Sequence, residues 1–189
     1  ENAGRFLKTI KSEGDRMSRL IGDMLSLANA DNKSWSIMKT DCELDTLLLD
    51  TYEKYQPILH GKKISLKVVL PEEPLSICKC DSARISQVLG ILLDNGASYV
   101  SAGGRMEMGE KENEKYFQLY VQDNGPGIPD ENKEAVFRRF YRADPARKEK
   151  QHFGLGLCIA REIVTLHKGS IHILDTPGGG STFVIRLPK

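Results

Sequence analysis

Two glycine-rich turns constrain the fold of this sequence more than any other feature. The first is Asp123-Asn124-Gly125-Pro126-Gly127-Ile128, which follows a stretch over 116–122 that alternates apolar and polar residues as a strand does. Its two glycines allow the backbone to adopt positive φ and to approach a ligand with no Cβ in the way. A carboxylate held at such a turn can accept a hydrogen bond from an exocyclic amine such as that of adenine; an ordinary turn is the alternative.

The second turn, Gly154-Leu155-Gly156-Leu157, opens a helical pattern over 155–167. Glycines at a helix N-terminus leave backbone N–H groups free to surround an anion, which predicts phosphate binding, although a simple loop-to-helix cap has the same pattern. The preceding residues 138–150 contain six basic and two acidic side chains, a local net charge of +4. Next to a phosphate site this segment favours a lid over a polyphosphate; in isolation a solvated loop explains it equally well.

A polar pair ends a third segment, Leu92-Leu93-Asp94-Asn95, directly after an apolar helical run. Tyr99 lies one helical turn beyond Asn95 on the same face. The amide oxygen of Asn95 is the kind of ligand that Mg²⁺ prefers when it bridges phosphates, and the ring of Tyr99 can lie against a base.

Length and composition predict a globular protein with one compact domain and an appendage. The 189 residues are 40% hydrophobic and 28% charged, which excludes general disorder, and 27 Lys and Arg against 26 Asp and Glu argue against nucleic-acid binding. No apolar run approaches the roughly 20 residues that span a bilayer, and no signal peptide is recognisable, so we expect the chain as given to be soluble. The four cysteines are expected to be reduced structural thiols in a cytosolic setting.

The appendage is a predicted long helix of coiled-coil type over residues 3 to about 30. Its apolar residues alternate spacings of three and four, and include Leu7, Ile10, Met17, Ile21 and Met24. We expect this helix to pair with a second copy of the chain, the alternative being that it packs on its own domain. A polar stretch then places a domain boundary near residue 35, which divides the chain into 1–34 and 35–189.

The second part is predicted to be an α+β two-layer sandwich, in which helices cover a mixed sheet. Asp81 is the expected N-cap of the helix that carries Asn95. The expected strands lie at 64–70, 75–79, 105–110, 116–122, 170–174 and 181–187, and the expected helices at about 44–55, 81–99, 130–139 and 155–167.

In their order along the chain, these segments resemble the catalytic and ATP-binding domain of two-component sensor histidine kinases. The wider ATPase family includes Hsp90, type II topoisomerases and mismatch-repair clamps. Residues 16–25 resemble the second helix of the dimerisation and phosphoacceptor hairpin that precedes this domain. The other matching segments are 89–99 (N box), 123–128 (first glycine box), 137–142 (F box), 154–157 (second glycine box) and 178–183 (last glycine box).

The resemblance implies that the chain binds ATP with Mg²⁺ and transfers the γ-phosphoryl group to a histidine that this sequence lacks. It also implies a homodimer, a response regulator receiver domain as partner, and a cytoplasmic position in a membrane-anchored bacterial receptor. By residue, it assigns Mg²⁺ to Asn95, the adenine amine to Asp123, the base pocket to Tyr99, Gly125, Gly127 and Ile128, phosphate binding to Gly154, Leu155, Gly156 and Leu157, and the γ-phosphoryl group to Arg142.

The sequence departs from the pattern of the family at three places, two single residues and one three-residue segment. Ile91 and Ser98 stand where an asparagine and a lysine are common, and Gln151-His152-Phe153 replaces a more usual Gly-Gly-Thr/Ser. Ile91 also stands where ATP-hydrolysing clamps of the Hsp90 type have a glutamate that activates water. Such a hydrolase is therefore the disfavoured alternative, and a catalytically inactive nucleotide-binding scaffold is another.

Overall fold

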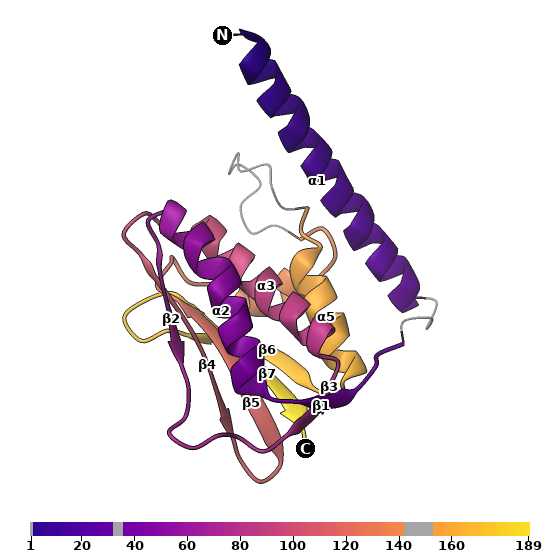
Figure 1. The fold of residues 1–189 in the computed structure, drawn as a ribbon, viewed down its shortest axis with the longest axis vertical. Helices are drawn as coiled ribbons and strands as arrows, with labels where there is room; N and C mark the ends of the chain where they lie inside the picture. Colours follow the sequence, from indigo (N-terminus) through magenta and orange to yellow (C-terminus); the bar gives the residue numbers. More distant parts are fainter. Residues whose placement is uncertain (1, 32–35, 142–152) are drawn as a thin grey trace.

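A computed structural model describes residues 2–31, 36–141 and 153–189. The main body has two layers: a five-stranded sheet, and helices α2, α3 and α5 against one of its faces (Figure 1). The long helix α1 (Asn2–Asp31) runs beside α5 and projects beyond this body. None of the described helices is long and apolar enough to cross a membrane.

The sheet has the strand order β2-β4-β5-β7-β6 and is mixed, as the sequence predicts. Strand β2 pairs with β4 in parallel, and every other neighbouring pair in this sheet is antiparallel. The strands are β2 (Ser65–Val69), β4 (Arg105–Glu112), β5 (Tyr116–Asp123), β6 (Ser170–Asp175) and β7 (Ser181–Pro188), and the helices over them are α2 (Leu44–Gly61), α3 (Ser82–Tyr99) and α5 (Gly156–Leu166).

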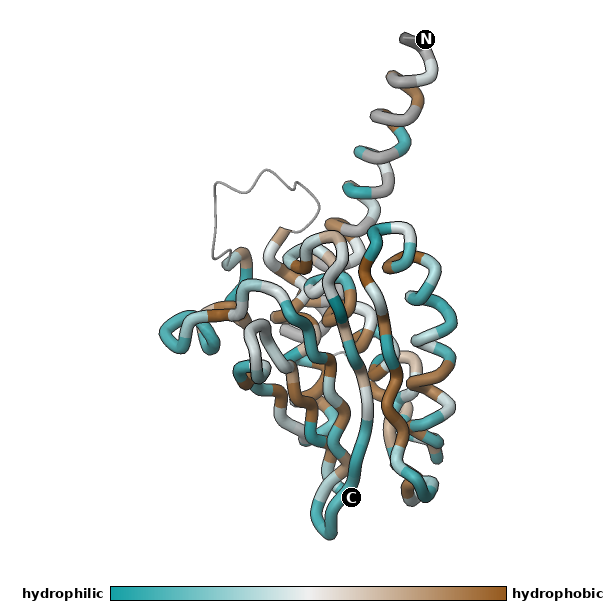
Figure 2. Tube along the Cα trace, turned by 90° about the vertical axis from the view of Figure 1, so that its left-hand side faces the viewer, coloured by the Kyte–Doolittle hydropathy of each residue, from teal (hydrophilic) through white to brown (hydrophobic). Residues whose placement is uncertain are grey.

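The core lies between the sheet and the three helices. Alternate residues of β5 face inward, because successive side chains of a strand point to opposite faces: Phe117, Leu119 and Val121 are all buried. Figure 2 shows hydrophilic residues at the turns that connect the elements. From α3, the side chains of Ile85, Val88, Leu89, Leu92 and Leu93 complete this core.

One predicted helix is wrong in length. The segment expected to be helical over 130–139 forms a short helix α4 (Asp130–Lys133) and then a single 3-10 turn η1 (Ala135–Phe137). The tighter turn directs Phe137 into the core, where its ring meets that of Phe183 edge-on at a centroid distance of 6.5 Å. Burial of one large ring thus outweighs continued helical hydrogen bonding.

A strand that the sequence did not reveal precedes α2. Strand β1 (Thr40–Cys42) pairs antiparallel with β3 (Cys78–Cys80), so that Cys42 lies opposite Cys78. Three residues are too few to show an alternating pattern, which explains the omission. All three cysteines of this small sheet are buried free thiols, as expected from the composition.

Helix α1 covers the whole range predicted for it, residues 3 to about 30. Its seam residues Leu7, Ile10, Met17, Ile21 and Met24 each expose more than half of their surface. Leu27, in contrast, is buried where α1 contacts α5. The helix therefore packs on its own domain along one side and leaves the seam uncovered by the described residues.

Candidate nucleotide-binding site

Helix α3 supports the candidate site. The side chain of Asp81 caps it by accepting a hydrogen bond from the backbone N–H of Arg84 at 3.1 Å, as predicted from the sequence. The buried apolar face fixes the rotation of the helix, which leaves Asn95 and Tyr99 partly exposed one turn apart. Ile91, Asn95 and Tyr99 therefore follow one another along a single side of α3.

Asp123 ends β5 and is the buried carboxylate of the site. Its Oδ1 accepts hydrogen bonds from the backbone N–H groups of Gly125 at 2.8 Å and Ser181 at 3.3 Å. Burial raises the pKa of Asp123, and these two hydrogen bonds oppose the increase. Because both bonds use Oδ1, they fix the carboxylate and leave Oδ2 for a ligand.

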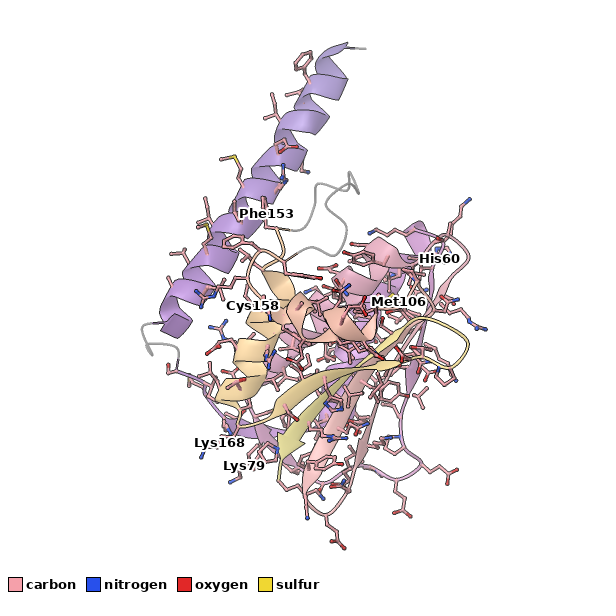
Figure 3. The ribbon with its side chains drawn as sticks, turned by 180° about the vertical axis from the view of Figure 1, so that it is seen from behind. His60, Lys79, Met106, Phe153, Cys158 and Lys168 are labelled. Atoms are coloured by element: carbon pink, nitrogen blue, oxygen red, sulfur yellow. The ribbon has the colours of Figure 1, made fainter. Side chains whose placement is uncertain are left out.

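Helix α3 and the last glycine turn both pack closely against the end of β5 at Asp123, through Gly96 and Gly180. A Cβ on Gly96 of α3 would overlap the end of the Met106 side chain, which Figure 3 labels. Gly180 has a φ of +107°, and a Cβ there would overlap the backbone oxygen of Asp123. At Gly180 only glycine fits, because the close atoms belong to the backbone and φ is positive, whereas at Gly96 the tip of the Met106 side chain would have to move. These close approaches hold α3 and the last glycine turn against the end of β5.

The first glycine turn is tied to the sheet and to α3. Asn124 accepts a hydrogen bond through its side-chain oxygen from the backbone N–H of Arg105 at 2.7 Å. Gly127 has the predicted positive φ, +78°. A Cβ on Gly125 would lie 3.7 Å from the carbonyl carbon of Tyr99, which places this turn against the end of α3. Ile128 is partly buried and packs on the core next to the turn.

The second glycine turn lies against the middle of α3, on the same side of the helix. Gly154 has a φ of +74°, and its carbonyl oxygen accepts a hydrogen bond from the backbone N–H of Phe140 at 2.9 Å. Leu155 is buried and places no capping side chain over the first N–H groups of α5. A Cβ on Gly156 would lie 3.2 Å from Cγ2 of Ile91, one helical turn before Asn95.

The two predicted glycine turns are thus brought together by α3. One lies at Tyr99 and the other at Ile91, about 12 Å apart along the helix axis, with Asn95 between them. The amide of Asn95 makes no hydrogen bond with any described residue, so its oxygen is available to a cation. The predicted Leu157 follows on α5 and is partly buried.

A surface hollow of about 580 Å³ lies elsewhere, near the N-terminal ends of α2 and α3, and shares no residue with this arrangement. Its lining includes Asp41, Glu43 and Asp50. The candidate site is therefore identified by its converging polar groups and turns, and not by the size of a cavity.

A family profile supplies an independent comparison. Residues 80–189, which include α3 and both glycine turns, match the family described as histidine kinase-, DNA gyrase B- and HSP90-like ATPase. The chain belongs to this ATPase family. The predicted membership of the wider ATPase family is thereby confirmed, and binding of ATP is supported for this ATPase domain.

Among curated relatives, the chain is similar to the sensor protein SrrB of Staphylococcus aureus (strain N315). The two are 34% identical over 184 residues, which is 97% of this chain and 31% of SrrB. This ATPase chain therefore spans about a third of the length of the curated relatives that it matches.

Two solved structures, one of them of the histidine kinase ThkA, have the same fold. Full-length ShkA in complex with AMPPNP has a TM-score of 0.86 at 21% identity, covering 97% of this chain and 38% of ShkA. ThkA in complex with the response regulator TrrA has a TM-score of 0.77 at 24% identity, covering 96% of this chain and 51% of ThkA. Both likenesses include the α+β ATPase fold, which confirms the predicted fold class.

Part of the predicted site lies outside the described residues of the ATPase domain. Residues 142–152 are not among the described residues, and this segment contains Arg142, His152 and most of the predicted basic lid. The role of Arg142 stays a prediction, as do the roles assigned to the other site residues. The structure adds the backbone N–H of Ser181 and the close packing at Gly96 and Gly180, and only the glycine run at 178–180 signalled any of these in the sequence.

Proposed function

We propose that this chain is the ATP-binding catalytic core of a sensor histidine kinase. It transfers the γ-phosphoryl group of ATP to a histidine on a helical hairpin, for relay to the receiver domain of a response regulator. One observation carries the proposal: the fixed carboxylate of Asp123 lies near the C-terminal end of α3 and the N-terminus of α5 lies against the middle of the same helix, with Asn95 between the two positions.

The end near Asp123 suits an adenine base. Oδ2 is positioned to accept a hydrogen bond from the exocyclic amine, and a base without that donor would leave a buried carboxylate oxygen unpaired. Tyr99 and Ile128 are proposed to provide apolar surface for the two faces of the base.

The end near Gly156 suits the phosphates. The first N–H groups of α5 lack a capping side chain, and the positive end of the helix dipole favours an anion there. The oxygen of Asn95 fits Mg²⁺, which commonly takes one or two protein ligands together with substrate phosphates. The described residues include no group of three or more His, Cys, Asp or Glu that could hold a metal by themselves. When bound, Mg²⁺ would neutralise charge on the phosphates.

Phosphoryl transfer needs mainly positioning and charge stabilisation, which the backbone amides of α5 and the proposed contact of Arg142 with the γ-phosphoryl group would provide. The acceptor histidine is proposed to lie on a helix outside this sequence. His167 is unsuited to the role, because it is buried with both ring nitrogens engaged, by the carbonyl of Ile163 and the N–H of Asp81.

The partners follow from α1. Its uncovered apolar seam supports a homodimer through the helical hairpin, the arrangement expected for a coiled-coil helix. The crystallised complex of ThkA with TrrA supports a response regulator as the recipient of the phosphoryl group. The similarity to longer sensor proteins supports a cytoplasmic position in a membrane-anchored receptor.

The position of Ile91 argues against an ATP-hydrolysing clamp. Its side chain contacts the first turn of α5, at the phosphate end of the site, and an isoleucine cannot accept a proton from water. We therefore expect negligible steady-state ATP hydrolysis. Strong turnover that Asn95→Ala abolishes would favour the clamp instead.

A phosphotransfer assay tests the proposal. The chain is mixed with γ-labelled ATP, Mg²⁺ and a complete hairpin supplied in trans from a related kinase. The expected product is an acid-labile, alkali-stable phosphate on the hairpin, absent when its histidine is replaced by glutamine. ATP binding by calorimetry without any labelled hairpin would instead support the inactive scaffold.

A further inference from the structure

Helix α1 contacts the main body directly beside the second glycine turn. The guanidinium carbon of Arg16 lies 4.7 Å from the centroid of the Phe153 ring. Figure 3 shows Phe153 next to α1, at the residue that leads into the turn before α5. Glu13 orients the guanidinium group by accepting a hydrogen bond from Nη1 of Arg16 at 3.1 Å.

This contact is partly withdrawn from water. The Arg16 side chain is 29% exposed, and its Nε is buried without a hydrogen-bond partner among the described residues. The ring of Phe153 also packs on the hydrophobic core. A stacked cation that has lost part of its hydration is attracted more strongly to an aromatic face than a fully exposed one.

Phe153 directly precedes Gly154, where the backbone of the turn is closely packed. Gly154 is in the left-handed region, and a Cβ there would lie 2.7 Å from the carbonyl oxygen of Tyr141. Tyr141 therefore restrains the turn at Gly154, and the Phe153 side chain is a second point of restraint, through which α1 contacts the turn.

Helix α1 has two distinct sides: one packs on the main body, and the other carries the exposed apolar seam. Arg16 and Leu27 are eleven residues apart, about three helical turns, so both lie on the side that faces the main body. The exposed seam at Met17, Ile21 and Met24 lies roughly a third of a turn around the helix. A rotation of α1 imposed through its seam would therefore move Arg16 relative to Phe153.

We infer that Arg16 is a positioning residue for the nucleotide site, which couples the placement of α1 to nucleotide affinity through Phe153. This inference rests on the proposed function, because it concerns the same phosphate-binding turn. Holding the turn in place before a ligand arrives reduces the ordering cost of binding. By thermodynamic reciprocity, a bound nucleotide must strengthen the attachment of α1 by the same factor.

Calorimetry with Mg·AMPPNP on the full chain tests the inference. Arg16→Ala is expected to weaken binding about three- to tenfold, whereas Arg16→Lys, which keeps a cation, is expected to retain most of the affinity. Arg16→Ala combined with Phe153→Leu is expected to bind no more weakly than Phe153→Leu alone. An affinity of Arg16→Ala within twofold of wild type would overturn the inference.

A matched control exists on the uncovered face of the sheet. Arg186 stacks on Tyr116 at 5.0 Å and also has a buried Nε without a partner among the described residues, but it lies away from the glycine turns. Arg186→Ala is therefore expected to leave nucleotide affinity unchanged. An equal loss of affinity in both variants would show a general effect on folding and contradict a positioning role for Arg16.

Hydrogen exchange provides a readout that an ordinary structural role would not change. In the wild-type chain, Mg·AMPPNP is expected to slow amide exchange over residues 13–20, and this response is expected to vanish in Arg16→Ala. If amide exchange in α1 of the wild-type chain is the same with and without Mg·AMPPNP, the coupling is contradicted. The proposed function fails separately, if the chain shows this coupling but phosphorylates no hairpin.

Discussion

The backbone N–H of Ser181 donates a hydrogen bond of 3.3 Å to Oδ1 of Asp123, although 58 residues separate the two in the sequence. Strands β5 and β7 are neighbours, so the start of one strand holds the functional group at the end of the other. Together with the N–H of Gly125, this bond leaves the carboxylate one orientation and one free oxygen.

Asp123→Asn tests the role of that free oxygen. The amide can still accept at one atom but presents N–H donors or a weaker acceptor to the base, so we expect Mg·ATP to bind more weakly by about 1 to 3 kcal/mol. Calorimetry measures the change, with the exposed Asp130→Asn as control. Unchanged affinity would remove adenine from the account of Asp123.

Gly180→Ala tests the close approach of the last glycine turn. Its Cβ would meet the backbone of Asp123 in addition to the strain of a positive φ, and we expect a loss of at least about 3 kcal/mol in the free energy of unfolding. Gly178→Ala is the matched control: φ is also positive, +87°, but no atom lies within 4 Å, and we expect about 1 kcal/mol. Equal losses in thermal denaturation would show that strain alone decides, and not the contact with Asp123.

Asn95→Ala tests the proposed cation site. Removing the amide oxygen should abolish the increase in ATP affinity that Mg²⁺ provides, while affinity measured in EDTA should change little because the base and turn contacts remain. Titrations with and without Mg²⁺ separate the two contributions, and Asn113→Ala, in the exposed turn between β4 and β5, is a control for loss of a surface amide elsewhere in the domain. A Mg²⁺ dependence preserved in Asn95→Ala would place the metal on other ligands.

Glu110 predicts an unusual pH dependence of stability. Both carboxylate oxygens are buried without a hydrogen-bond partner among the described residues, and burial raises the pKa of Glu110 to about 7, with Asp45 and Glu112 adding repulsion. Between pH 4.5, the ordinary pKa of the side chain in the unfolded state, and about pH 7, Glu110 therefore stays protonated in the folded state but is ionised in the unfolded state. Its contribution to stability is complete below pH 4.5 and is lost as the pH rises towards 7.

Denaturant unfolding at pH 5 and pH 8 measures this effect. Glu110→Gln is expected to unfold with a smaller difference between the two conditions and to be more stable than wild type at pH 8, by about 1 to 3 kcal/mol. Glu114→Gln, in the exposed turn between β4 and β5, is the control, because Glu112 itself contributes to the raised pKa of Glu110. A wild-type-like pH dependence in Glu110→Gln would refute this account.

Local patterns predicted the elements that carry the site. Alternation predicted β5, apolar spacing and the Asp81 cap predicted α3, and the paired glycines predicted both turns, because each of these depends on residues close in sequence. The contact of Ser181 with Asp123, the pairing of Cys42 with Cys78 and the burial of Phe137 were not predicted. Each results from tertiary packing between distant segments, which no local pattern specifies.

Ile91, Asn95 and Tyr99 lie on one continuous helix, so α3 sets the spacing between the groups proposed to contact the ligand. The two glycine turns contact α3 at Ile91 and at Tyr99, so the distance between them is set by helical rise and cannot adjust independently at either contact. One residue inserted after Asn95 would rotate Tyr99 by about 100° and carry it away from Gly125. The arrangement therefore tolerates exchange of side chains along α3 far better than any change in its length.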